Sequence, residues 1–231
     1  MMFYPYYFDP TYVLVLIGAI FSIWASQRVN STFARYNRVR AMSGLTAAEA
    51  AAEILRRNGI YDVTIHHRGG NLTDCYVPSK KELYLSDSTY NSTSIAAIGV
   101  AAHECGHAIQ DARHYAPLTI SNAIHPLCAI GSNLGFPILI IGILFSMQSL
   151  IGIGIILFSL GVLISLITLP VEYNASNRAL AILGETGMLS DEELVGTKRV
   201  LRAAGLTYVA AAASMILSLL RMILLSRRSD N

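Results

Sequence analysis

The sequence predicts an α-helical membrane protein that carries a small α+β domain and three or four transmembrane helices. Hydrophobic residues make up 53% of its 231 residues and charged residues only 14%, whereas soluble domains carry about a quarter charged residues. Four apolar stretches are long enough to be membrane helices or nearly so. A more polar stretch separates the first two, and it contains the motif His103-Glu104-Cys105-Gly106-His107.

The four apolar stretches cover residues 12–25 (10–27 at their widest), 127–147, 150–169 and 208–225. The second and third are uncharged and match the roughly 20 residues that a bilayer span needs. Only Gln148 and Ser149 separate them, which predicts a tight helical hairpin. The fourth contains Arg221, so it either spans the membrane or lies partly in the interface.

Basic residues predict the orientation of the spans. No Lys or Arg precedes residue 28, ten lie between residues 28 and 113, and four lie between 178 and 202. The positive-inside rule places these two regions in the cytoplasm and the N-terminus outside. The C-terminal pair Arg227-Arg228 disagrees, because four full spans would place it outside.

The first apolar stretch does not have the pattern of a cleaved signal peptide. Residues 1–10 contain no Lys or Arg, whereas a signal peptide begins with a basic region. Aromatic residues before position 9, together with Trp24, are expected to anchor the two ends of a span at the membrane interface.

The polar stretch predicts a helix followed by a small sheet. Thr46 and Glu49 form a capping-box pattern that opens an Ala-rich helix ending near Gly59. Strand patterns separated by turn signals follow at residues 61–67, 72–77 and 82–85. The third strand could pair with an extended substrate as an edge strand, or serve only the fold.

Two further helices are expected after the sheet. Asn91 or Ser92 caps the first, which runs to about residue 112 and carries the motif. A second capping-box pattern, Ser190 to Glu193, opens a helix that we expect to stop at Gly205.

The motif itself predicts a zinc site. His103 and His107 are four residues apart and share one face of a helix, and Glu104 follows the first. In zincin-type peptidases two such His bind Zn²⁺ and the Glu takes a proton from the attacking water. Cys105 lies on another helical face, where we expect packing. The three Cys are scattered without a C-x-x-C pair, which argues against a disulfide framework or a thiolate zinc site.

A catalytic zinc needs a third protein ligand and one open position. The candidates are Asp111, His114, His125 and Glu172. Glu172 fits best, because it directly follows a span whose hairpin returns the chain to the side of the motif. Asp111 lies one turn beyond His107 and is as readily a ligand-orienting residue as a solvated carboxylate. His114 and His125 are more typical of ordinary interfacial residues.

Three blocks of the sequence, at 85–87, 100–110 and 169–176, resemble the YugP-type neutral zinc metallopeptidases of bacterial membranes. The resemblance covers nearly the whole chain, and a more distant one links it to the HtpX-type membrane proteases. It implies that Glu172 is the third zinc ligand and Glu104 the catalytic base. It also implies that the chain lies in a bacterial cell membrane.

The last block departs from both patterns. Asn174 stands where the YugP-type pattern has Asp, and Ser176 stands where the HtpX-type pattern has Asp. A carboxylate that would orient a ligand His is therefore missing or supplied from elsewhere, and such a loss typically costs about 10–100-fold in metal affinity or activity. Arg178 is a candidate for binding the oxyanion or a substrate carboxylate, although such an Arg is more often solvated.

These patterns predict five segments: an N-terminal transmembrane helix (1–27), a zincin-like catalytic domain (28–126), a transmembrane hairpin (127–169), a third-ligand helical segment (170–206) and a C-terminal transmembrane or interfacial helix (207–231).

We therefore expect a multi-pass zinc metalloendopeptidase that hydrolyses peptide bonds at the cytoplasmic membrane surface. The alternative is a non-catalytic zinc-binding membrane scaffold or adaptor that retains the protease fold. The expected partners are a protein or peptide substrate and the lipid bilayer. Glycines in the hairpin permit close helix packing within one chain or between copies, so a homo-oligomer is a further candidate. The net charge of +2 argues against a nucleic-acid partner.

Overall fold

The computed structural model describes residues 9–229, which fall into two compact units. The first unit contains the described residues up to Trp24, together with Ile124–Leu166 and the described residues from Val209 onward. The second contains Ala25–Ala123 and Ile167–Tyr208. The aromatic anchors expected before position 9 lie outside the described residues.

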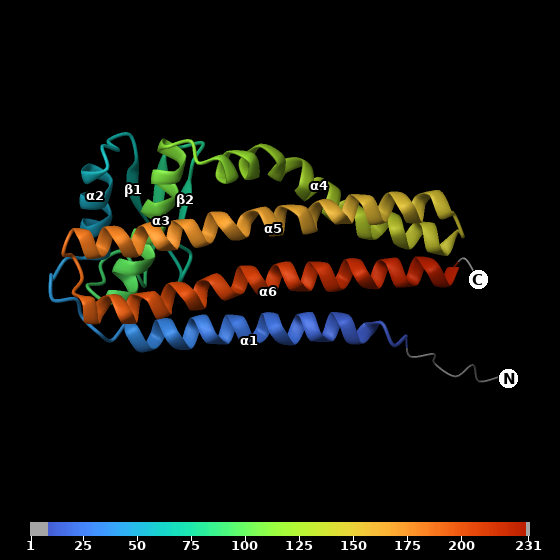
Figure 1. Ribbon diagram of the computed structural model, residues 1–231, viewed down its shortest axis with the longest axis horizontal. Helices are drawn as coiled ribbons and strands as arrows, with labels where there is room; N and C mark the ends of the chain where they lie inside the picture. Colours follow the sequence, from blue (N-terminus) through green and yellow to red (C-terminus); the bar gives the residue numbers. More distant parts are fainter. Residues whose placement is uncertain (1–8, 230–231) are drawn as a thin grey trace. The chain divides into compact units, whose positions relative to one another are not determined.

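The chain is an α-helical membrane protein with a small α+β domain (Figure 1). Four helices are long and apolar enough to cross a membrane: α1 (Tyr12–Tyr36), α4 (Ala116–Leu144), α5 (Gln148–Glu185) and α6 (Asp191–Ser229). The predicted membrane class is confirmed, with four candidate spans.

Two expected boundaries between helices were wrong. The turn of the hairpin lies at 145–147, so Gln148 begins α5 rather than forming the turn. Helix α6 runs through Gly205 without a break, although the Ser190–Glu193 capping box opens it as predicted. One Gly in a helix costs about 1 kcal/mol relative to Ala, which the long run of helix-forming residues around it outweighs.

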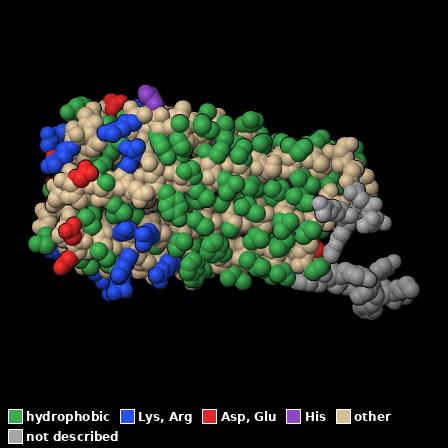
Figure 2. Space-filling model, viewed as in Figure 1, with side chains coloured by type: hydrophobic (Ala, Val, Ile, Leu, Met, Phe, Trp, Pro, Cys, Tyr) green, Lys and Arg blue, Asp and Glu red, His purple; other side chains and the backbone are tan. Residues whose placement is uncertain are grey.

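In the first unit, glycines bring α4 and α5 into close contact. A Cβ added at Gly135 would lie 2.6 Å from the backbone nitrogen of Phe158, and one at Gly154 would lie 2.7 Å from that of Leu139. Small residues are the usual means of close packing between membrane helices. The glycine pattern therefore serves packing within the chain at these positions. Hydrophobic side chains cover the face of these helices that Figure 2 shows.

Arg221, the charge within the last apolar stretch, has partners in the same unit. Its guanidinium lies 3.6 Å from the carboxylate of Asp9 and 4.1 Å from the ring centre of Tyr12. A charge within a membrane helix is costly unless it is paired in this way.

The second unit contains a three-stranded sheet with the order β1-β3-β2. Its strands are β1 (Thr64–Arg68), β2 (Cys75–Val77) and β3 (Glu82–Ser86). Strand β3 pairs in parallel with β1 and in antiparallel with β2. It is therefore the central strand, so of the two roles considered for 82–85 the edge-strand role was wrong and the structural role agrees with the sheet order. The edges of the sheet are β1 and β2.

Helices α2 (Ala47–Arg57) and α3 (Ile95–Ala112) pack with this sheet around one hydrophobic core. Thr46 and Glu49 form the predicted capping box. Ser94, rather than Asn91 or Ser92, caps α3, with its hydroxyl accepting a hydrogen bond from the backbone of Ala97. On the side opposite its two histidines, α3 packs against α2 in this core.

Candidate metal centre

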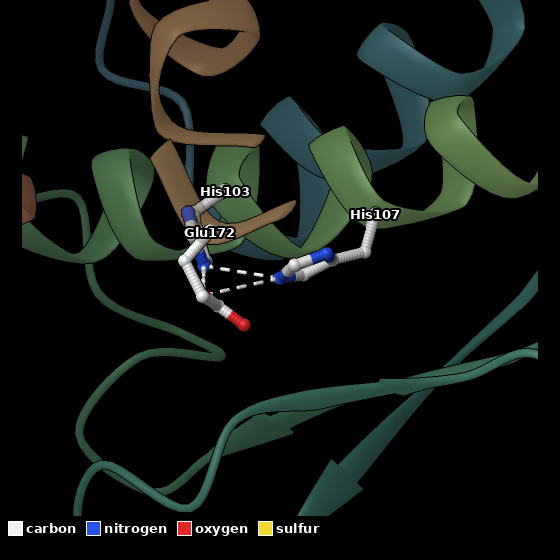
Figure 3. Close-up of side chains that lie close together, drawn as sticks. All are labelled: His103, His107 and Glu172. Atoms are coloured by element: carbon white, nitrogen blue, oxygen red, sulfur yellow. Dashed lines mark hydrogen bonds and ion pairs between the residues drawn. The ribbon is translucent and has the colours of Figure 1, made fainter. Parts of the chain in front are cut away.

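Three potential metal ligands meet in the second unit (Figure 3). His103 and His107 come from consecutive turns of α3, and Glu172 comes from α5. The two His Nε2 atoms lie 3.2 Å apart. The Glu172 Oε2 atom lies 3.2 Å from Nε2 of His103 and 3.6 Å from Nε2 of His107.

This triangle has the size that zinc requires. With metal–ligand bonds of about 2.0–2.1 Å, neighbouring ligands of a tetrahedral zinc lie about 3.3–3.4 Å apart. Two imidazoles and one carboxylate are also a known set of ligands for a catalytic zinc, which keeps its fourth position open. Among the described residues the ligand cluster contains neither Asp111 nor His114 nor His125.

Close contact between α3 and α5 brings Glu172 to the histidines. A Cβ added at Gly106 would lie 2.7 Å from the carbonyl oxygen of Ala175 and 3.1 Å from its Cα. Any side chain at position 106 would therefore push α5 away from α3. The glycine between Glu104 and His107 thus determines how near Glu172 comes.

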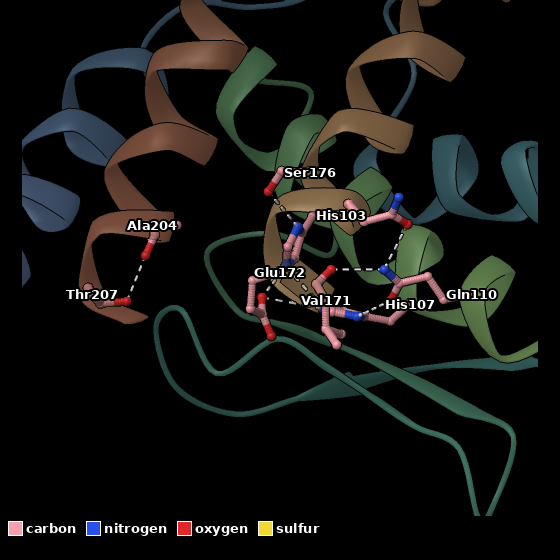
Figure 4. Close-up of polar contacts among 9 residues, drawn as sticks. His103, His107, Gln110, Val171, Glu172, Ser176, Ala204 and Thr207 are labelled. Atoms are coloured by element: carbon pink, nitrogen blue, oxygen red, sulfur yellow. Dashed lines mark hydrogen bonds and ion pairs between the residues drawn. The ribbon is translucent and has the colours of Figure 1, made fainter. Parts of the chain in front are cut away.

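Neutral side chains hold the Nδ1 atoms of both histidines (Figure 4). Nδ1 of His103 lies 3.1 Å from the hydroxyl of Ser176, and Nδ1 of His107 lies 3.0 Å from Oε1 of Gln110. These partners orient the rings with Nε2 toward the metal position, as outer hydrogen bonds do in other zinc sites. A hydroxyl and an amide thus stand in place of the carboxylate that the resemblance implies.

Gln110 is itself fixed by α5. Its Nε2 donates to the carbonyl of Val171 at 2.8 Å and to Oδ1 of Asn174 at 3.0 Å. The same Oδ1 accepts a hydrogen bond of 2.7 Å from Nε of Arg178. Asn174 therefore acts through Gln110, and Arg178 supports Asn174.

Sequence reasoning did not assign a role to Gln110. The available signal was its position three residues after His107, on the same helical face. It is fully buried, which is uncommon for a Gln without a specific partner.

Glu104 lies beside the ligands. It is buried, and it lines a hollow of about 180 Å³ together with His103 and Glu172. Asp74 and Tyr208 line the same hollow. Burial raises the pKa of Glu104 above its usual range, while the two neighbouring histidines act to lower it. A carboxyl group in this setting can hold a proton as well as release one.

Asp111 lies outside the cluster of potential ligands and contacts the sheet instead. Its Oδ2 accepts hydrogen bonds from the Tyr76 hydroxyl at 2.8 Å and from Nζ of Lys81 at 2.7 Å. It thereby joins the end of α3 to the sheet. Cys105 is buried and its Sγ lies 3.6 Å from the carbonyl of Ala51, in agreement with the packing role expected for it.

Fold and site together define a class, that of membrane proteins with a zinc-peptidase motif and a carboxylate as the third potential metal ligand. Residues 11–227 match the model of the family described as "Putative neutral zinc metallopeptidase". The chain is 44% identical over 223 residues to "Putative membrane protease YugP" of Bacillus subtilis (strain 168), covering 95% of this chain and 99% of that protein. No solved structure matches the chain significantly. The chain belongs to this neutral zinc metallopeptidase family, and its cofactor is zinc.

Proposed function

We propose that the chain is a membrane-bound metalloendopeptidase that hydrolyses peptide bonds at the cytoplasmic membrane surface. The observation that carries this proposal is the zinc-sized triangle of His103, His107 and Glu172 with the carboxyl group of Glu104 beside it. Zinc binding alone does not require Glu104. The cytoplasmic side follows from the ten basic residues at 28–113 against none before them.

The residues divide the work as follows. His103, His107 and Glu172 hold the zinc, which when bound polarises the scissile carbonyl and lowers the pKa of water. Glu104 accepts the proton of the attacking water and passes it to the leaving amine. The burial that raises the pKa of Glu104 favours its holding the proton between these transfers.

Tyr208 is our candidate for stabilising the oxyanion. It lines the same hollow as Glu104 and Glu172, and its hydroxyl is a neutral donor. Arg178 was considered for this role, but its Nε donates to Asn174.

The position of the substrate follows from the sheet. Strand β2 is an edge strand of the sheet: it pairs with β3 on one side and with no other strand of the described residues, and α3 lies against it. Leu72 and Asp74, just before β2, line the hollow of the site. An extended peptide that adds to β2 by main-chain hydrogen bonds would therefore pass the metal position. This gives the edge-strand role to β2 instead of β3.

Peptide cleavage by the zinc-loaded full-length protein in detergent micelles tests the proposal. We expect a peptide library to be cleaved by the wild type and by Glu185→Gln, an identical chemical change at an exposed position. Glu104→Gln should retain zinc and lose cleavage. Retained cleavage in Glu104→Gln would refute the role of Glu104. A zinc-loaded wild type without cleavage of any peptide would favour the scaffold or adaptor instead.

A further inference from the structure

A second, strongly basic hollow lies in the same unit. Its volume is about 440 Å³, and it is lined by one face of α1 and one face of α6. Helix α1 contributes Arg28, Ser31 and Arg35, which recur every three or four residues as one helical face requires. Helix α6 contributes Arg199 and Arg202 with the same spacing.

The four arginines have no carboxylate partner among the residues that the structure describes. No Asp or Glu lines the hollow, and Nη1 of Arg199 donates to the hydroxyl of Tyr36 at 2.8 Å. Arg35 lies with its guanidinium 5.7 Å from the centre of the same ring. Four guanidinium groups around one hollow, none of them in an ion pair among the described residues, repel one another, so a bound anion would relieve this repulsion.

The donors suit a phosphate group. Arginine presents several N–H groups in a fixed plane that matches phosphate oxygens, and Ser31 adds a hydroxyl donor. Figure 2 shows Lys and Arg side chains gathered on the surface of this unit.

The position along both helices points to a lipid. Arg28 follows the first apolar stretch, 12–25, within one helical turn. Arg202 precedes the last apolar stretch, 208–225, by six residues, or about 9 Å of helix. Arg28 and Arg202 therefore lie where their helices leave the hydrocarbon layer, near the level of the lipid phosphates, and Arg35 and Arg199 follow further out on the same helical faces. Basic pockets between membrane helices are known to bind acidic headgroups.

We propose that this hollow binds the phosphodiester headgroup of an anionic phospholipid. The headgroup links α1 to α6. Val29 of α1 and Ala204 of α6 also line the hollow that contains Glu104, so the lipid holds together two helices that form a wall of the metal site. The lipid site depends on none of the peptidase chemistry proposed above.

Trp24 offers a built-in reporter. It is the single Trp of the sequence, it is half-exposed, and it lies one turn before Arg28 on the same side of α1. The full-length protein is reconstituted into phosphatidylcholine vesicles that contain brominated phosphatidylglycerol or, at the same mole fraction, brominated phosphatidylcholine. We expect the anionic lipid to quench Trp24 more strongly than the zwitterionic one.

Matched variants identify the site. Arg35→Gln with Arg202→Gln should lower the apparent affinity for phosphatidylglycerol about 30-fold, since each basic residue near the surface contributes about one factor of five. The single variant Arg35→Gln should show part of this loss. The control variant Arg56→Gln with Arg57→Gln also removes two positive charges, from the exposed face of α2, and should leave the excess quenching by phosphatidylglycerol unchanged.

Three results would overturn the proposal. The first is undiminished preference for phosphatidylglycerol in both Arg35 variants. The second is an equal loss in the α2 control, which would indicate general surface charge. The third is abolition of the excess quenching by inorganic phosphate in the buffer, which would assign the hollow to a soluble anion.

Discussion

The clearest mechanical prediction concerns Gly106→Ala. The added Cβ would lie 2.7 Å from the carbonyl oxygen of Ala175, where ordinary contact begins at 3.4 Å. Helix α5 must therefore retreat from α3 by roughly 0.7 Å. Metal–ligand distances tolerate only about 0.2 Å of change. Glu172 moves with α5, so the triangle should open beyond what zinc accepts.

The expected loss of zinc affinity in Gly106→Ala follows from the cost of overpacking, about 1–3 kcal/mol. If the zinc-bound state bears this strain and the metal-free state relaxes, zinc affinity should fall about 5- to 150-fold. Titration of the metal-free protein against a zinc chelator of known affinity measures this change.

Gly152→Ala is the matched control, since Gly152 also lies in a helix but has no atom within 4 Å of an added Cβ. It should bind zinc as the wild type does. Wild-type zinc affinity in Gly106→Ala would refute the argument that this contact sets the position of Glu172.

Three further predictions concern the surroundings of the metal. Burial acts to lower the pKa of His107, but the neighbouring carboxylates raise it to about 9. Below pH 9 zinc must therefore displace a proton from His107, and the affinity of the protein for zinc should rise about tenfold per pH unit up to pH 9. Calorimetry in buffers of different ionisation enthalpy counts the released proton, and pH-independent binding would be the contrary result. Gln110→Ala should weaken zinc binding about 10–100-fold in competition with a chelator, because His107 loses its hydrogen-bond partner. Asn174→Asp keeps the oxygen that accepts from Gln110 and should bind zinc as the wild type does. Equal zinc affinities in the wild type and both variants would refute the role of the hydrogen bonds from Asn174 through Gln110 to His107. Asp111→Ala should lower the free energy of unfolding by about 1 kcal/mol, because the Tyr76 hydroxyl loses its acceptor, and should leave zinc binding unchanged. Thermal melts measure the change in stability, and a loss of zinc binding would contradict the structural role of Asp111.

Local patterns predicted the parts of the fold that depend on near neighbours. The Thr46–Glu49 box opens α2, three strands form where alternation indicated them, and the motif lies on a helix. Each of these depends on hydrogen bonds or side-chain spacing within a few residues. The membrane helices were predictable for the same reason, because length and apolarity decide them.

Features that depend on distant contacts were not predictable. The strand order is set by the parallel pairing of β1 with β3, which no local pattern specifies. Gly205 has the local signal of a helix end, yet it lies inside α6. Its cost is outweighed by the long run of helix-forming residues on both sides of it, which the signal of one glycine does not reveal.

The metal site likewise has parts that local sequence patterns predict and parts that depend on distant contacts. His103, Glu104 and His107 could be read from their spacing alone, whereas Glu172 needed the hairpin argument. The partners of the histidines, Gln110 and Ser176, emerge only when α5 is placed against α3.

X-ray absorption at the zinc edge tests the central claim most directly. The zinc-loaded full-length protein should show four nitrogen or oxygen neighbours at about 2.0–2.1 Å, with scattering from two imidazoles and none from sulfur. Glu172→Ala should lose one protein oxygen and bind zinc more weakly. A sulfur neighbour at about 2.3 Å, or a zinc environment and affinity unchanged in Glu172→Ala, would contradict the site described.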